Sequence, residues 1–222
     1  MSQFIIILVL VVASGYLLER FLISILGYYI FRFLTAPGII VHELSHAICA
    51  ILFRAKIKSF QVFKLEGGEV RYTQPIFPFL TNPIISISPI LGCSIVIFFA
   101  GNLLGFDFHH FNLQFSYSDL FSFFKSFDFT SVKTYLFLYL MLSLTSAMAP
   151  SRKDLTNSFY GLLFIFMIFF LINYYLPSSS IVFLKIGYFY LIGFYMIVLA
   201  LTITATFWFL KFISFKLIFK RG

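Results

Sequence analysis

Long apolar runs constrain the fold of this 222-residue chain more than any other feature of its sequence. Hydrophobic residues make up 61% of the chain and charged residues only 11%, whereas soluble domains contain about 25% charged residues. One compact core cannot bury so much apolar surface, so a soluble enzyme is excluded. The sequence predicts an all-α polytopic membrane protein with about six transmembrane helices. The predicted spans cover residues 4–26, 37–53, 84–104, 132–149, 159–176 and 182–210.

Basic residues are distributed unevenly between the two sides of this predicted topology. The links after the second and fourth spans, together with the C-terminal tail, hold 11 of the 16 lysines and arginines. Because cytoplasmic loops of membrane proteins are enriched in these residues, we expect a multi-pass integral membrane protein with both termini in the cytoplasm. The same asymmetry accounts for the net charge of +8. No basic stripe interleaved with aromatic side chains points to nucleic acid as a partner.

The least apolar stretch follows the second span, at residues 54–74. Its first part alternates polar and apolar residues, and a second strand-like run begins shortly after Gly67-Gly68. Two such runs around a Gly-Gly turn predict a short cytoplasmic β-hairpin. In the third span, Pro89 and Gly92 predict a kinked or broken helix.

The second span contains the sequence His42-Glu43-Leu44-Ser45-His46. Residues four apart lie on one face of a helix, so both imidazoles can bind the same metal ion. In this motif Glu43 is the general base that takes a proton from a water molecule, and one Zn²⁺ per chain is the expected cofactor. The alternative is that backbone carbonyls or polar partners on neighbouring helices satisfy both histidines without a metal. We favour the metal site because a charge at the centre of a span costs about 2.5 kcal/mol or more.

A catalytic zinc site usually has three protein ligands and one open position for water, so a third ligand is needed. The candidates on the predicted cytoplasmic side are Asp154, Glu66 and Glu69. We favour Asp154, which follows the fourth span just past its predicted cytoplasmic end, because few other groups are available there. The alternative role for Asp154 is a surface ion pair with Arg152 or Lys153.

A membrane-embedded His-Glu-x-x-His, a short hairpin and a later Pro-containing Asp segment together resemble the site-2 protease family of intramembrane zinc metalloproteases. In that family the third ligand is the Asp of Asn-x-x-Pro-x-x-x-Leu-Asp-Gly. The matching stretch here is 149–155, in which Pro150 precedes Asp154 by four residues and the Asn and Gly are absent. The resemblance covers the second to fourth spans. It implies one membrane domain, 1–222, with a catalytic core at 37–158 and accessory segments at 1–36 and 159–222.

The resemblance also implies an activity, namely the hydrolysis of peptide bonds in or near transmembrane segments of membrane-protein substrates. Asn82, before the third span, and Gly67 and Gly68 in the hairpin are the residues expected to contact an extended substrate. Two alternatives stay open. One is a non-catalytic membrane adaptor or metal-binding protein with a degenerate site. The other is a CAAX-processing or heat-shock-type membrane metalloprotease, whose third ligand is a Glu.

Overall fold

The computed structural model describes residues 2–62, 68–106, 125, 127–148, 151, 154 and scattered positions from 156 to 209. Within these residues the fold is mostly helical, with one small two-stranded antiparallel sheet. The elements are α1 (Ser2–Leu26), α2 (Tyr28–Leu34), α3 (Ala36–Leu52), β1 (Ile57–Gln61), β2 (Glu69–Tyr72), α4 (Pro78–Leu104) and α6 (Val132–Ser146).

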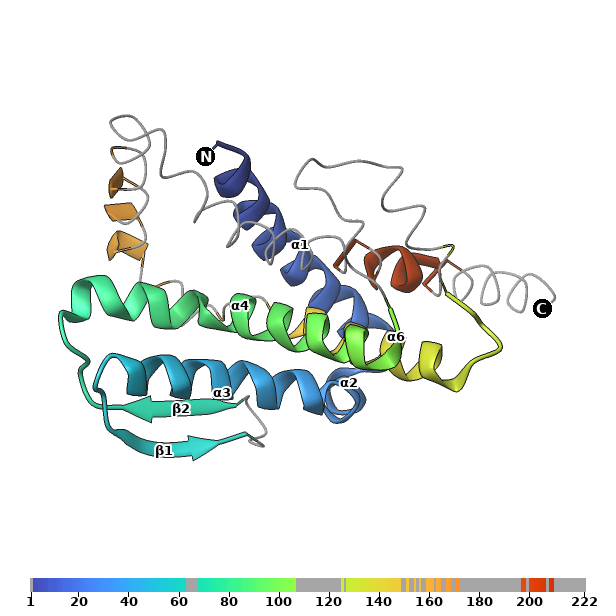
Figure 1. Cartoon of the computed structure of the whole chain (residues 1–222), viewed down its shortest axis with the longest axis horizontal. Helices are drawn as coiled ribbons and strands as arrows, with labels where there is room; N and C mark the ends of the chain where they lie inside the picture. Colours follow the sequence, from blue (N-terminus) through green and yellow to red (C-terminus); the bar gives the residue numbers. More distant parts are fainter. Residues whose placement is uncertain are drawn as a thin grey trace, which may run out of the picture.

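The helix α3 is the centre of this arrangement (Figure 1). α4 runs alongside α3, the hairpin of β1 and β2 packs against α3 as well, and α6 contacts both α3 and α4. α1 packs on α2 and α6. The main apolar cluster joins these helices through buried side chains that include Leu18, Phe31, Ile90, Phe137 and Met141. The motif-bearing helix is therefore held by two helices and the hairpin.

The number of membrane spans differs from the prediction. Among the described residues, α4 is the one helix long and apolar enough to cross a membrane by itself, and α2 with α3 passes only as a pair bent by 71°. The described residues therefore show one or at most two candidates, not six. Most side chains in the first half of α1, the first predicted span, lie outside the described residues. The apolar runs here form helices of 17 residues in α3 and 15 in α6, and a bilayer requires roughly 20. The predicted spans 159–176 and 182–210 fall largely outside the described residues.

The interior of α4 contains both residues of the predicted kink or break. Pro89 and Gly92 predict a kink or a break, yet α4 continues as one helix through both positions. The helix is not broken, because a membrane helix tolerates a missing proline N–H when other donors use the carbonyl that it frees; a kink at these positions stays a prediction. Here the Ser88 hydroxyl donates to the carbonyl of Ile85, four residues before Pro89, at 2.7 Å.

The predicted β-hairpin is confirmed. β1 and β2 pair antiparallel, with Phe60 opposite Val70 and Gln61 opposite Glu69. The turn at 63–67, which includes Gly67, lies outside the described residues. The cytoplasmic location of the hairpin and of both termini stays a prediction, as does the division of the single domain after residues 36 and 158.

Two glycines allow α3 to approach its neighbouring helices closely. A Cβ atom on Gly38 would lie 2.0 Å from the Ser143 carbonyl oxygen of α6, and the Gly38 N–H donates to the Ser143 hydroxyl at 2.9 Å. A Cβ atom on Gly92 of α4 would lie 1.9 Å from the Ser45 hydroxyl of α3. Both distances are far too short for a side chain, so glycine sets the spacing of the three helices. This spacing brings backbone carbonyls of α4 and of the end of α6 within reach of the histidines on α3.

Candidate metal centre

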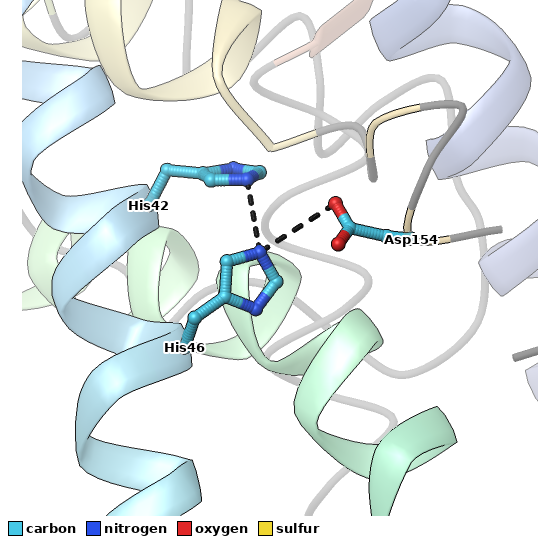
Figure 2. A group of neighbouring side chains, drawn as sticks. All are labelled: His42, His46 and Asp154. Atoms are coloured by element: carbon cyan, nitrogen blue, oxygen red, sulfur yellow. Dashed lines mark hydrogen bonds and ion pairs between the residues drawn. The ribbon is translucent and has the colours of Figure 1, made fainter. Parts of the chain in front are cut away.

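Three side chains from distant parts of the sequence converge beside α3 (Figure 2). His42 and His46 lie one turn apart on that helix, and their Nε2 atoms are 3.1 Å apart. Asp154, more than a hundred residues later, places its Oδ2 atom 3.6 Å from His46 Nε2. One ligand atom from each of the three residues lies within 4.8 Å of the others, and the group could hold a metal ion.

Backbone carbonyl groups orient both imidazole rings. Nδ1 of His42 lies 2.5 Å from the carbonyl oxygen of Ala147, at the C-terminal end of α6. Nδ1 of His46 lies 2.8 Å from the carbonyl oxygen of Ile85 in α4. A carbonyl oxygen only accepts hydrogen bonds, so the partners assign the proton of each neutral ring to Nδ1. Each Nε2 atom is then left with the lone pair that a metal ion requires.

The three ligand groups fit a divalent metal ion. With protons on both Nδ1 atoms, two Nε2 lone pairs and one carboxylate face the same small space. Such a cluster of acceptors has no donor of its own, and a cation shared by all three removes the repulsion between them. Imidazole nitrogens and a carboxylate oxygen are ligands that zinc accepts in tetrahedral sites. These residues would therefore hold the ion and leave a fourth position open.

A local turn fixes the orientation of Asp154. The Ser151 N–H and hydroxyl both donate to Asp154 Oδ2, at 3.0 and 2.5 Å, and the Asp154 N–H donates back to the Ser151 hydroxyl at 3.2 Å. This reciprocal pattern is a capping box in which Asp takes the place of Glu. Burial raises the pKa of Asp154, but a positively charged His46 and the two Ser151 donors outweigh burial and lower the pKa to about 2 when no metal is bound. A metal cation bound beside neutral His46 would supply the same positive charge. The carboxylate is thus the charged form, which is the form that binds metal ions.

Glu43 faces the same cavity as the three converging side chains. The cavity has a volume of about 500 Å³ and is lined by His42, Glu43, His46, Ser151 and Asp154 together with Lys58 and residues 68–72 of the hairpin. Glu43 is 6% exposed. A Cβ atom on Gly68 would lie 2.3 Å from Glu43 Oε1, so only glycine fits there without moving the Glu43 side chain. The hairpin therefore packs directly on the predicted general base.

The other predicted site residues have separate positions. Glu69, an alternative third ligand, lines the cavity but forms an ion pair with Arg71 at 3.1 Å. Glu66 and Gly67 lie outside the described residues. Asn82 lies within α4 and is not among the residues that line the cavity. Its buried Oδ1 atom has no hydrogen-bond partner among the described residues.

Sequence reasoning missed three groups that orient the candidate ligands. Ser151 could have been found, because Ser-x-x-Asp at 151–154 is the sequence signature of a capping box. The carbonyls of Ala147 and Ile85 carry no side-chain signal, since any residue provides a carbonyl. The indirect signals were the nearby helix end and a proline four residues after Ile85.

Comparison with known proteins gives one match. Residues 4–113, about half of the chain, match the family described as Peptidase M50B-like. Neither a curated protein nor a solved structure matches the chain. The matched segment contains α3 with the His42–His46 motif and ends before Asp154. This match confirms the resemblance seen in the sequence: the chain belongs to the Peptidase M50B-like family of site-2 protease-type metallopeptidases.

Proposed function

We propose that this protein is an intramembrane zinc metalloprotease that hydrolyses peptide bonds in or near transmembrane segments of membrane proteins. The observation that carries the proposal is the convergence of two imidazole Nε2 atoms and a carboxylate next to Glu43. The family match supports the same chemistry, because it covers the helix that holds three of these four residues. In this proposal His42, His46 and Asp154 hold one Zn²⁺, and Glu43 is the general base.

The residues of the cavity divide the chemistry between them. When bound, zinc supplies a Lewis acid that polarises the substrate carbonyl and makes water a stronger nucleophile near neutral pH. Glu43 accepts the proton that the attacking water loses, and then donates it to the leaving amine. The carbonyls of Ala147 and Ile85 keep the two imidazoles in their ligating tautomer throughout. The low exposure of Glu43 limits competing contacts with bulk water.

The substrate must reach this cavity as an extended chain. A transmembrane helix keeps its backbone groups paired with one another, so its scissile peptide bond becomes accessible only after the helix opens locally. We propose that β2 then pairs with the opened segment by strand addition. Two observations support this role. Within the described residues the sheet has two strands, so each has an edge that the other does not pair, and residues of β2 line the cavity beside Glu43.

Replacing residues 64–72 with a flexible linker of equal length is expected to reduce cleavage to background while zinc stays bound. The linker removes the strand edge but leaves His42, His46 and Asp154 in place. Zinc content and cleavage rate should be measured on the same purified sample. Gln61→Ala, at an exposed position on β1 that does not line the cavity, serves as the control and should cleave normally. Unchanged cleavage by the linker variant would contradict strand addition.

The proposed activity itself can be tested by isotope labelling. The protein is reconstituted with zinc in lipid vesicles together with a panel of transmembrane-segment peptides, in water enriched in ¹⁸O. Hydrolysis places one ¹⁸O atom in the new C-terminal carboxylate, which mass spectrometry detects. A zinc chelator should stop the incorporation, and added zinc should restore it. No cleavage of any peptide by the zinc-loaded protein would instead favour a non-catalytic metal-binding protein.

A further inference from the structure

The carbonyl that orients His46 is one that its own helix cannot use in the normal way. In an α-helix the carbonyl of residue 85 accepts from the N–H of residue 89. Residue 89 is proline, which has no N–H and whose ring pushes the carbonyl four residues earlier away from the helix. The Ile85 carbonyl instead accepts from His46 Nδ1 at 2.8 Å and from the Ser88 hydroxyl at 2.7 Å.

We propose that Pro89 is a positioning residue of the metal centre, because its missing N–H leaves the Ile85 carbonyl to hold the His46 imidazole. The inference rests on the proposed metal site and adds a residue that does not touch the metal. A carbonyl oxygen has two lone pairs, and His46 and Ser88 use both. An N–H at position 89 would be a third donor to the same oxygen. It would compete with the imidazole for the one contact that fixes the direction of His46 Nε2.

The other histidine of the motif, His42, is oriented on the same principle. His42 Nδ1 contacts the carbonyl of Ala147, the C-cap residue of α6. The last carbonyls of a helix have no donor within the helix. Both imidazoles are therefore held by helix carbonyls without a normal helical partner. At Ala147 the helix end provides this carbonyl, and at Ile85 a proline in the middle of a helix provides it.

A second proline in α4 provides a matched control. Pro83 is also inside the helix, and it frees the carbonyl of Phe79. That carbonyl faces Gly161, on which a Cβ atom would lie 2.4 Å from the Phe79 oxygen. Within the described residues it is not a partner of either motif histidine, because His42 Nδ1 contacts the carbonyl of Ala147 and His46 Nδ1 that of Ile85. Replacing Pro83 therefore also restores a backbone N–H inside α4. At that position the N–H adds no donor to the carbonyl that holds His46.

The test compares Zn²⁺ affinity of the full-length protein in detergent, measured by competition with a fluorescent zinc chelator. Pro89→Ala should weaken zinc binding about tenfold, the lower range for losing a group that orients a metal ligand. Pro83→Ala should change it less than twofold. A third variant carries the α-hydroxy acid analogue of alanine at position 89, introduced by nonsense suppression. It lacks both the ring and the N–H, and it should bind zinc as wild type does.

The outcomes separate this inference from the proposed function. If wild type binds zinc and Pro89→Ala binds it equally well, or if both proline variants weaken binding to the same extent, the role of Pro89 is wrong while the metal site stands. If the hydroxy acid variant binds as weakly as Pro89→Ala, the ring and not the missing N–H matters, which also overturns the inference. If wild type binds no zinc, the metal site itself is wrong.

Discussion

Glu43→Gln is expected to lower the rate of peptide cleavage by a factor on the order of 10²–10⁴ while zinc stays bound. The substitution keeps the size and the buried position of the side chain but removes its ability to accept a proton from water. His42, His46 and Asp154 are unchanged, so the ligands of the proposed site remain in place. The measurement pairs initial cleavage rates on a transmembrane peptide with zinc content determined by elemental mass spectrometry.

The matched control for this variant is Glu19→Gln, the same substitution in α1. Glu19 does not line the cavity, so its replacement should leave both the cleavage rate and the zinc content unchanged. Full activity in Glu43→Gln would rule out Glu43 as the general base. Loss of zinc in that variant would indicate that Glu43 is itself a ligand, which would contradict the assignment of Asp154 as the third one.

His46→Ala and Asp154→Ala are each expected to remove the bound zinc and abolish cleavage. Each variant leaves two of three protein ligands, and Asp154→Ala also removes the negative charge that offsets the metal. Elemental mass spectrometry of the detergent-purified proteins should show near one zinc per chain in wild type and almost none in either variant. Asp128→Ala is the control, because the Asp128 carboxylate accepts hydrogen bonds from Thr130 and does not belong to the cluster.

The outcome for Asp154 distinguishes between the candidate third ligands. If zinc is lost with His46→Ala but retained with Asp154→Ala, Asp154 is not a ligand and Glu69 or Glu66 takes its place. The ion pair between Glu69 and Arg71 argues against that alternative, as does the 3.6 Å separation of Asp154 Oδ2 from His46 Nε2.

The sequence predicts those parts of the site that depend on short-range spacing. His42 and His46 share a helix face because they are four residues apart, and the hairpin follows from two alternating runs around glycines. The position of Asp154 depends on how α6 and the Ser151 turn pack on α3, which no local pattern determines. The sequence could therefore only favour Asp154 over Glu66 and Glu69 without assigning the third ligand.

Hydropathy was less informative about the helices themselves. It finds apolar runs but does not show where a helix ends, so α6, which ends at Ser146, was predicted as a full span to residue 149. Pro89 predicts a kink or a break because proline removes a hydrogen bond within the helix. In the structure the freed Ile85 carbonyl is used by His46 and Ser88, and the helix continues. A local rule failed here because a side chain from another helix supplied the missing donor.

X-ray absorption spectroscopy of the zinc-loaded protein tests the central claim most directly, because it reports the atoms bound to the metal. The account predicts four light ligands at about 2.0–2.2 Å, with the outer-shell scattering of two imidazoles and no sulfur. These are His42, His46, Asp154 and one water. A Zn–S distance of about 2.3 Å, a single imidazole, or the same spectrum in wild type and His46→Ala would contradict the account.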